Sequence, residues 1–265
     1  MEKNYTALGL MSGTSGDGVD VSLISSDGID QYREITNKYF KYDQKMNENL
    51  HNLKAKILKF DDLKKNEDEI NNLEREITLF HAQIVNQILK IIDEKVDFIG
   101  FHGQTIYHDP LEKISKQIGD GNLLSQLTKK TVVYNFRQND LKNGGQGAPL
   151  TPIFHQTVKS ILSDNWWPVL FLNIGGISNV TSTSKFPTIL ENKLDHLNNL
   201  FASDIAPGNC LIDEWIRKNS NNKYDKDGLI ARSGKVNELI LNQALDNYLR
   251  ETHESFPISS LDIKD

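Results

Sequence analysis

The chain has few of the features that mark secreted, membrane-embedded or nucleic-acid-binding proteins. Cys210 is its single cysteine, so no disulfide can form within the chain, and this favours a reducing compartment such as the cytoplasm. The net charge is -6, and the lysines are mixed with acidic residues, which argues against a nucleic-acid partner. The apolar run Ala7–Met11 near the N-terminus is too short for a signal peptide or a membrane span. The composition therefore predicts a cytoplasmic protein with neither a membrane nor a nucleic acid as partner.

Several common catalytic signatures are also absent. The sequence has no G-x-x-x-x-G-K-[ST], so a P-loop is excluded, and its glycines do not form the G-x-G-x-x-G of a dinucleotide-binding fold. No G-x-S-x-G supports a serine hydrolase, and no histidine or cysteine cluster has the spacing of a zinc site. Any phosphate site in this chain must therefore be built in another way.

Two glycine-rich turns supply such a way. Gly9–Asp20 and Asn173–Asn179 each begin as an apolar strand, break at glycine and hydroxyl residues, and resume as a strand. Glycine allows a tight turn and a close approach of the backbone, so the N–H groups of the turn can point at phosphate oxygens. One turn lies in each half of the chain, as a phosphate clamp between two domains requires. The pair predicts an enzyme that uses ATP.

The carboxylates beside the first turn allow two interpretations. Asp17 and Asp20 could hold Mg²⁺, directly or through water, because this hard ion prefers oxygen ligands. Asp17 could equally fix the turn through an Asx-type hydrogen bond. In either case the hydroxyl groups of Thr14 and Ser15 lie beside the backbone amides of the turn.

Further candidates for chemistry lie at predicted strand ends. Asp204 precedes Pro-Gly-Asn and a helix, so its carboxylate could act as a general base, or could cap the helix, for which Asn209 is better placed. His102-Gly-Gln-Thr105 is a suitable set of contacts to sugar hydroxyls, although a histidine with a purely structural hydrogen bond fits the sequence as well. Gln146, in a glycine-rich loop, offers another polar contact.

The apolar pattern predicts strands followed by helices in both halves of the chain. We expect strands at 6–11, 19–25, 32–40, 97–101, 131–134, 168–173, 177–181 and 201–204. We expect helices at 44–60 (capped by Asp43), 68–92, 150–162, 211–218 and 235–249. This order predicts an α/β fold of two lobes with a cleft between them, divided near Gly147 into residues 1–147 and 148–265.

Taken together, these segments resemble the anhydro-N-acetylmuramic acid kinases of the sugar kinase/Hsp70/actin superfamily. The matching segments are Gly9–Asp20, His102–Thr105, Asn135–Leu150, Asn173–Thr181, Asp204–Asn209 and Tyr224–Gly228. They follow the family's order and span nearly the whole chain, so their combination is specific although each is weak alone. The resemblance implies two actin-like, ribonuclease-H-like lobes with an interdomain cleft, and a homodimer.

The resemblance also implies a reaction and a role for each candidate residue. Such kinases use ATP and Mg²⁺ on 1,6-anhydro-N-acetylmuramic acid, an anhydro amino sugar from cell-wall (peptidoglycan) turnover. Water opens the anhydro bridge at the anomeric carbon, the released O6 takes the γ-phosphate, and Asp204 falls on the position of the base that activates the water. The predicted ATP-binding residues are Gly13, Thr14, Ser15, Gly16, Asp17 (also the metal ligand), Gly18, Val19, Asp20, Gly175, Gly176 and Asn179. The predicted sugar-binding residues are His102, Gln104, Thr105, Gln146 and Asn209.

The sequence departs from the family pattern in three places. Gly16 stands where the family usually has a larger residue, and Ile205-Ala206 replaces the usual Thr-Gly beside the predicted base. The chain stops at Asp265, where the family continues, so we expect a second lobe that is incomplete at its C-terminus and leaves a sheet edge uncovered. An alternative function is therefore an inactive remnant that binds the anhydrosugar without turning over ATP.

Overall fold

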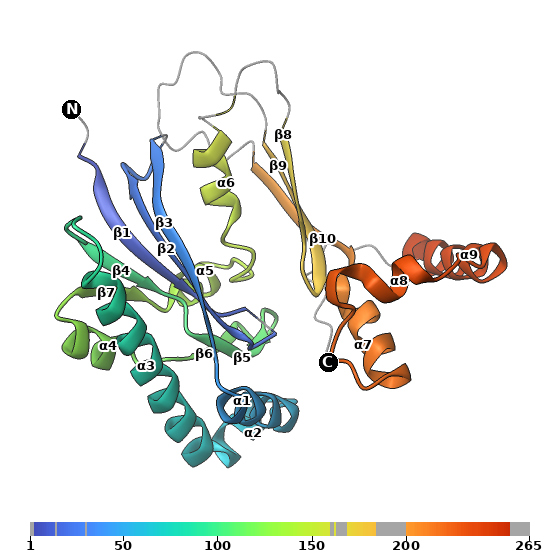
Figure 1. The fold of residues 1–265 in the computed structure, drawn as a ribbon, viewed down its shortest axis with the longest axis horizontal. Helices are drawn as coiled ribbons and strands as arrows, with labels where there is room; N and C mark the ends of the chain where they lie inside the picture. The colour runs from blue at the N-terminus through green and yellow to red at the C-terminus, as the bar shows by residue number, and fades with distance from the viewer. Residues whose placement is uncertain are drawn as a thin grey trace.

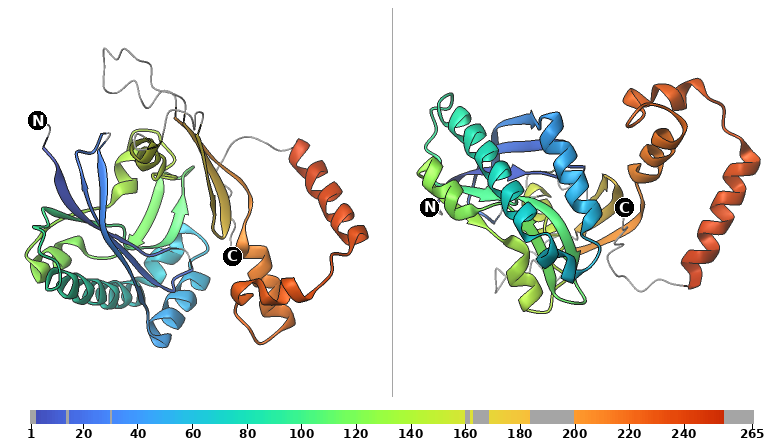
Figure 2. Two further views of the ribbon diagram at one scale, coloured as in Figure 1. Left: turned by 45° about the horizontal axis from the view of Figure 1, so that its top comes forward. Right: turned by 90° about the horizontal axis from the view of Figure 1, so that it is seen from below.

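The computed structural model of the chain describes residues 3–13, 15–29, 31–159, 162, 169–183 and 200–254. These residues form a mixed α/β structure with a five-stranded sheet, a three-stranded sheet and a two-stranded hairpin (Figure 1). The predicted α/β class is confirmed. The five-stranded sheet and its helices lie on one side of the molecule, and the three-stranded sheet and the last helices lie on the other (Figures 1 and 2).

The five-stranded sheet contains the five strands predicted in the first half of the chain. They are β1 (Tyr5–Met11), β2 (Gly18–Ser26), β3 (Tyr32–Lys41), β4 (Phe98–Phe101) and β7 (Thr131–Tyr134). The order across the sheet is β3-β2-β1-β4-β7, antiparallel from β3 to β1 and parallel from β1 to β7. The three parallel strands therefore end at the same edge of the sheet.

Four helices accompany this sheet and share its core. They are α1 (Gln44–Lys56), α2 (Phe60–Lys65), α3 (Glu67–Leu89) and α4 (Gly121–Thr128). The three-and-four spacing predicted for α3 buries Leu73, Ile77 and Ile84, and these side chains belong to one cluster with Leu8 and Ile99 of the sheet. This cluster is the main hydrophobic core of the described chain.

The predicted helix over 44–60 is two helices. Asp43 caps α1 as predicted, because its carboxylate accepts a hydrogen bond from the Met46 N–H at 2.8 Å. At Ile57 the backbone leaves the helical region (φ -99°, ψ 87°), and the Ile57 side chain turns into the core instead of continuing the helix. Burial of one isoleucine thus overrides the local helical pattern.

A hairpin that the sequence pattern does not predict lies between β4 and α4. Its strands are β5 (Gln104–Asp109) and β6 (Ile114–Ile118), so the His-Gly-Gln-Thr segment begins a strand rather than a loop. After β7 comes the short helix α5 (Phe136–Lys142), which leads into the glycine-rich loop at 143–149.

Helix α6 (Pro152–Lys159) contacts both sheets. It is shorter than the predicted 150–162, of which residues 160 and 161 lie outside the described residues. Its Phe154 ring packs edge-on against the Tyr32 ring of β3, with 5.1 Å between the ring centroids. Its His155 ring stacks on the Phe171 ring with 4.6 Å between centroids, and His155 Nδ1 lies at hydrogen-bonding distance, 2.9 Å, from Thr181 Oγ1. The helix therefore joins the edge of the first sheet to the second.

The second sheet is antiparallel and carries the predicted glycine hairpin. Its strands are β8 (Val169–Ile174), β9 (Ile177–Thr183) and β10 (Leu200–Pro207), in the order β10-β9-β8. The last strand is longer than the predicted 201–204 and runs through Pro207. Beyond it lie α7 (Asn209–Asn219), the 3₁₀ turn η3 (Lys226–Gly228), α8 (Leu229–Ser233) and α9 (Glu238–Glu254).

The second sheet and the last helices leave large apolar side chains in solvent. Helix α9 stands clear of both sheets in all three views (Figures 1 and 2). The exposed side chains include Leu170, Leu172, Ile174, Leu211, Trp215, Leu239 and Ile240. No helix in the described part of the chain is both long enough and apolar enough to cross a membrane.

Candidate functional site

Three loops meet where the parallel strands of the first sheet end. Ser12 and Gly13 follow β1, His102 follows β4, and Asn135 leads from β7 into α5. The carboxyl edge of parallel strands is the usual ligand edge of an α/β sheet. The structure therefore brings the first glycine hairpin and the His-Gly-Gln-Thr segment together, as a shared site requires.

Gln104 ties these two segments through its side-chain amide. Its Oε1 accepts the Ser12 hydroxyl at 2.5 Å, and its Nε2 donates to the Gly13 carbonyl at 2.9 Å. Tyr42 in turn donates its hydroxyl to Ser12 Oγ at 3.1 Å, and burial raises the pKa of Tyr42 to about 12, so that the donor stays protonated. Gln104 is fully buried, and its amide holds the hairpin in place.

Arg137 ties the His102 loop to the glycine-rich loop at 143–149. Its Nε and one terminal nitrogen point to His102 Nε2 at 3.3 and 3.0 Å, and its other terminal nitrogen donates to the Gly147 carbonyl at 2.7 Å. His102 Nδ1 lies 2.8 Å from the Gly103 carbonyl, which can only accept, so this nitrogen carries the proton. Burial, and then the charge of Arg137, lower the pKa of His102 and keep its ring neutral.

The turn of the first hairpin is tight and packed. Gly16 donates its N–H to the Gly13 carbonyl at 3.1 Å, and its own carbonyl accepts from Asn47 Nδ2 at 2.9 Å. Gly16 has a φ of +62°, and an added Cβ would lie 2.6 Å from Leu50 Cδ2. The positive φ favours glycine at this position, and a side chain there would have to displace the Leu50 side chain of α1. Ser15 is exposed, and Thr14 lies outside the described residues.

The acidic residues of the first hairpin face solvent. Asp17 and Asp20 are both exposed, whereas Val19 between them is fully buried and could meet a ligand only through its backbone. The pKa of Tyr39 on the next strand is raised, first by burial and then by the charges of Asp17 and Asp20. Asp20 pairs with Tyr39 across β2 and β3, so this carboxylate and the phenol lie on the same face of the sheet. No group of three or more metal-ligating side chains occurs within the described ranges.

The second glycine hairpin is docked on the start of α7. Gly208 donates its N–H to the Gly176 carbonyl at 2.8 Å, and Asn209 donates its N–H to the Gly175 carbonyl at 2.7 Å. A Cβ at Gly208 would lie 2.2 Å from the Gly175 carbonyl oxygen, so only glycine fits there. The prediction that Asn209 caps this helix is wrong: Gly208 is at the cap position, and Asn209 Nδ2 donates to the Ile174 carbonyl at 3.2 Å.

Asp204 lies on β10 beside this hairpin. It is half-buried and pairs in the ladder with Asn179, another predicted ligand residue. The ladder shifts its register between Asp204 and Ala206, so the replaced Ile205-Ala206 pair lies in an irregular stretch of the strand. Such bulges re-aim neighbouring side chains, which suits a residue that must point into a site.

The other predicted contacts differ in exposure. Thr105 is half-buried and its hydroxyl accepts from Gln117 Nε2 at 3.1 Å, while Gln146 is exposed at the tip of its loop. Ser12, Tyr42 and Arg137 were not predicted as site residues. Ser12 and Arg137 lie inside segments that carried the family resemblance, whereas nothing in the sequence marked Tyr42, which reaches the site from the end of β3.

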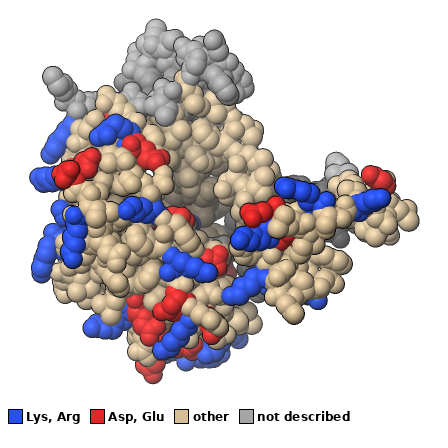
Figure 3. Space-filling model, in the orientation of Figure 1, with Lys and Arg blue, Asp and Glu red and all other residues tan. Residues whose placement is uncertain are grey.

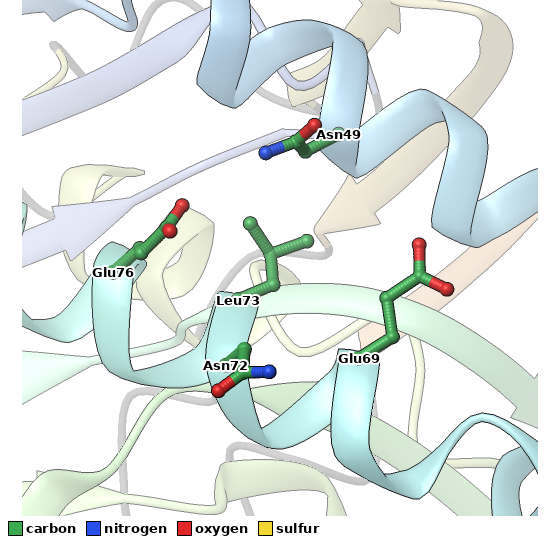
Figure 4. A pocket seen from close by; sticks show the side chains of 5 residues that line it. All are labelled: Asn49, Glu69, Asn72, Leu73 and Glu76. Carbon is green, nitrogen blue, oxygen red and sulfur yellow. The ribbon is translucent and has the colours of Figure 1, made fainter.

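A small surface hollow between α1 and α3 contains none of the predicted residues. Figure 4 shows Asn49 of α1 facing Glu69, Asn72, Leu73 and Glu76 of α3. Glu69 is engaged by Lys56 at 2.7 Å. The space-filling view shows a depression between the two halves of the molecule (Figure 3). The candidate site is therefore assigned to the strand ends and not to the hollow on the helices.

Comparison with known proteins identifies the family of the chain. A family model described as anhydro-N-acetylmuramic acid kinase matches residues 5–254. The chain is 53% identical over 268 residues to a protein of that name from Pelagibacter ubique, covering 99% of this chain and 68% of the relative. It is 38% identical to proteins of the same name from Agrobacterium fabrum and Rhizobium etli, covering 87% and 93% of this chain and 60% and 65% of those relatives. The chain thus spans about two thirds of the length of these relatives, or somewhat less.

Proposed function

The chain belongs to the anhydro-N-acetylmuramic acid kinase family, and from this premise we propose that it converts 1,6-anhydro-N-acetylmuramic acid, water and ATP to N-acetylmuramic acid 6-phosphate and ADP. The reaction would serve peptidoglycan recycling in the cytoplasm. The proposed protein is a homodimer, and each chain has two lobes that divide near Gly147. The observation that carries the proposal is the convergence of the first glycine hairpin, His102 and Arg137 at the carboxyl edge of β1, β4 and β7.

Asp204 is proposed as the general base. Its carboxylate takes a proton from water, the water oxygen bonds the anomeric carbon, and the bond from that carbon to O6 breaks. The released O6 then attacks the γ-phosphorus, and ADP leaves. A positioned carboxylate contributes about 10²- to 10⁴-fold to such a proton transfer. The bulge beside Asp204 and its pairing with Asn179 support this role.

The two glycine hairpins are proposed to bind the phosphates of ATP. The backbone of 13–20 would approach the phosphates from the first sheet, and Gly175, Gly176 and Asn179 from the second. Asp17 and Asp20 fit Mg²⁺, because the ion is commonly held by one or two carboxylates together with phosphate oxygens, and both side chains are exposed. When bound, Mg²⁺ would neutralise charge on the transferred phosphoryl group.

The sugar is proposed to lie on His102, Thr105, Gln146 and Asn209. His102 is neutral and both of its ring nitrogens already have partners, Gly103 and Arg137, so its proposed role is to position Arg137 and to contact the sugar through its ring. Gln104 is included only through the hairpin that it holds, since both ends of its amide already have partners in the chain.

Mass spectrometry of the product formed in ¹⁸O-labelled water tests the proposal. The chain is incubated with Mg-ATP and 1,6-anhydro-N-acetylmuramic acid, and the expected product has gained one phosphate and one labelled oxygen. N-acetylmuramic acid in labelled water without protein measures spontaneous exchange at the anomeric carbon. A product that gained phosphate with the anhydro bridge intact, or the absence of any phosphorylated sugar, would overturn the proposed reaction.

A further inference from the structure

Arg137 is a half-buried cation that no described carboxylate neutralises. Its partners are a neutral imidazole and a backbone carbonyl, both of which only accept its N–H groups. None of the ion pairs within the described ranges includes it. The pKa of Arg137 is lowered by burial alone, with no acidic group acting in the opposite direction.

This arrangement differs from an ordinary structural arginine. Charges that are drawn away from water in folded proteins are normally paired, because an unpaired charge loses part of its hydration without compensation. Arginine has five N–H donors in a planar fork, and the described contacts use three of its nitrogens through one N–H each. Two N–H donors therefore remain on the terminal nitrogens, and these can bind an oxyanion in bidentate fashion.

The nearest acidic side chain along the helix has another role. Asp140 lies one helical turn after Arg137 and is exposed, and its Oδ2 accepts the Gly147 N–H at 2.7 Å. Asp140 and Arg137 thus hold opposite ends of the same residue, Gly147, one through its N–H and the other through its carbonyl. Both side chains therefore fix the loop, but only the Arg137 guanidinium also contacts His102, so that its positive charge lies between His102 and Gly147.

We infer that Arg137 binds a carboxylate of the substrate, and that it thereby distinguishes an acidic sugar from a neutral one. The inference rests on the proposed function, under which this group is the lactyl carboxylate of the anhydro sugar. A carboxylate is favoured over a phosphate of ATP because Arg137 joins the two predicted sugar-binding loops, at His102 and Gly147. The guanidinium makes no described contact with the hairpin at 13–20.

The test compares the binding of the anhydro sugar with that of its lactyl methyl ester, which has the same ring but no charge. Calorimetry gives the dissociation constants of both for the unaltered protein and for Arg137→Gln. We expect Arg137→Gln to weaken binding of the acid about 10- to 100-fold, the range for a hydrogen bond to a charged group. Binding of the ester should change by no more than about 3-fold, so the preference for the acid disappears in the variant.

Asp140→Asn is the matched control, because it loosens the same loop without removing the cation. It should weaken acid and ester by equal factors. If Arg137→Gln does not fold, Arg137→Lys replaces it, and this variant should keep a preference for the acid because it keeps the charge.

The outcomes separate the inference from the proposed function. Equal weakening of acid and ester by Arg137→Gln, or equal binding of both ligands by the unaltered protein, would overturn the inference and leave the kinase reaction standing. Failure of the unaltered protein to bind either sugar would overturn both. An acid preference that survives Arg137→Gln would assign carboxylate recognition to another residue.

Discussion

The two halves of the molecule stabilise their parts of the site in different ways. In the first half, strands and helices share one buried cluster that runs from Leu8 to Leu124. Among the side chains described at 169–182 and 202–247, Ile216 is the one large apolar side chain that is buried, while Leu172 and Trp215 are 53% and 65% exposed. Side-chain networks hold the loops of the first half, whereas backbone contacts between Gly175, Gly176 and the start of α7 hold the second hairpin.

This difference assigns different consequences to substitutions in the two halves. The first half positions its loops by packing, so changes in its core should appear as lost stability. The second half carries Asp204 on a sheet with little apolar burial, so changes there should appear in the rate while the free energy of unfolding changes little.

Asp204→Asn should lower kcat by about 10²- to 10⁴-fold, because the amide cannot accept the proton of the attacking water. Affinity for the sugar should change little, since the side chain keeps its shape. Steady-state kinetics with calorimetric binding checks both statements. Asp213→Asn, which removes a carboxylate from α7 nearby, serves as control and should keep most of the rate. An Asp204→Asn protein of nearly normal kcat would remove Asp204 from the role of base.

Truncation of one aliphatic side chain in each sheet measures the contrast in packing directly. Ile99 is fully buried and Leu172 is 53% exposed. Ile99→Ala should lower the free energy of unfolding by about 2–5 kcal/mol through lost burial and a cavity. Leu172→Ala should change it by no more than about 0.5 kcal/mol, as at other exposed positions. Urea denaturation of both variants measures these changes. Equal losses of unfolding free energy would mean that the exposed face of β8 is covered in solution.

Much of the fold followed from local sequence patterns. The alternation in β1 and β2 and the spacing along α3 predicted these elements to within a few residues, because burial of one face dictates both patterns. The hairpin β5–β6 was missed, since its mixed polar residues are buried by packing on α1, α3 and α5 rather than by a simple alternation. The break at Ile57 was missed for a related reason: a tertiary contact decides it.

The site was predictable in part. Glycine turns locate the two hairpins, but the sequence cannot show that the side-chain oxygen and nitrogen of Gln104 are hydrogen-bonded to Ser12 and Gly13. Nor can it show that Arg137 lies between His102 and Gly147, because these three residues meet only through the parallel order of β4 and β7. The general base and the phosphate-binding residues remain predictions. Their test is kinetic.

His81 should make the first half less stable in acid. Its ring is fully buried with no described partner at Nε2, and burial lowers its pKa from 6.5 to about 4 despite the bond from Nδ1 to the Ile77 carbonyl. The unfolded chain therefore takes up a proton first as the pH falls, so stability is lost between about pH 6.5 and pH 4. His81→Leu should abolish this part of the loss, up to roughly 3 kcal/mol.

Urea denaturation at pH 7 and pH 4.5 checks the prediction for His81. The decrease in the free energy of unfolding between the two pH values should be smaller in His81→Leu than in the unaltered chain. An identical decrease in both proteins would show that His81 does not contribute to the acid sensitivity.

Tyr42→Phe should have the smallest effect, confined to the attachment of the first hairpin. The substitution removes only the hydroxyl that donates to Ser12 Oγ, and the ring keeps its contact with Phe80 at 5.1 Å. A lost neutral hydrogen bond costs about 0.5–1.5 kcal/mol, so the KM for ATP should rise by roughly 2- to 10-fold at nearly constant kcat. Tyr5→Phe, at an exposed ring of the same sheet, should leave KM and kcat unaltered. A larger fall in kcat than in ATP affinity would mean that Ser12 acts in the chemical step. No change in either quantity would show that the Tyr42 hydroxyl is not needed, and that Gln104, Asn47 and the backbone hydrogen bond of the turn are sufficient to hold residues 13–16.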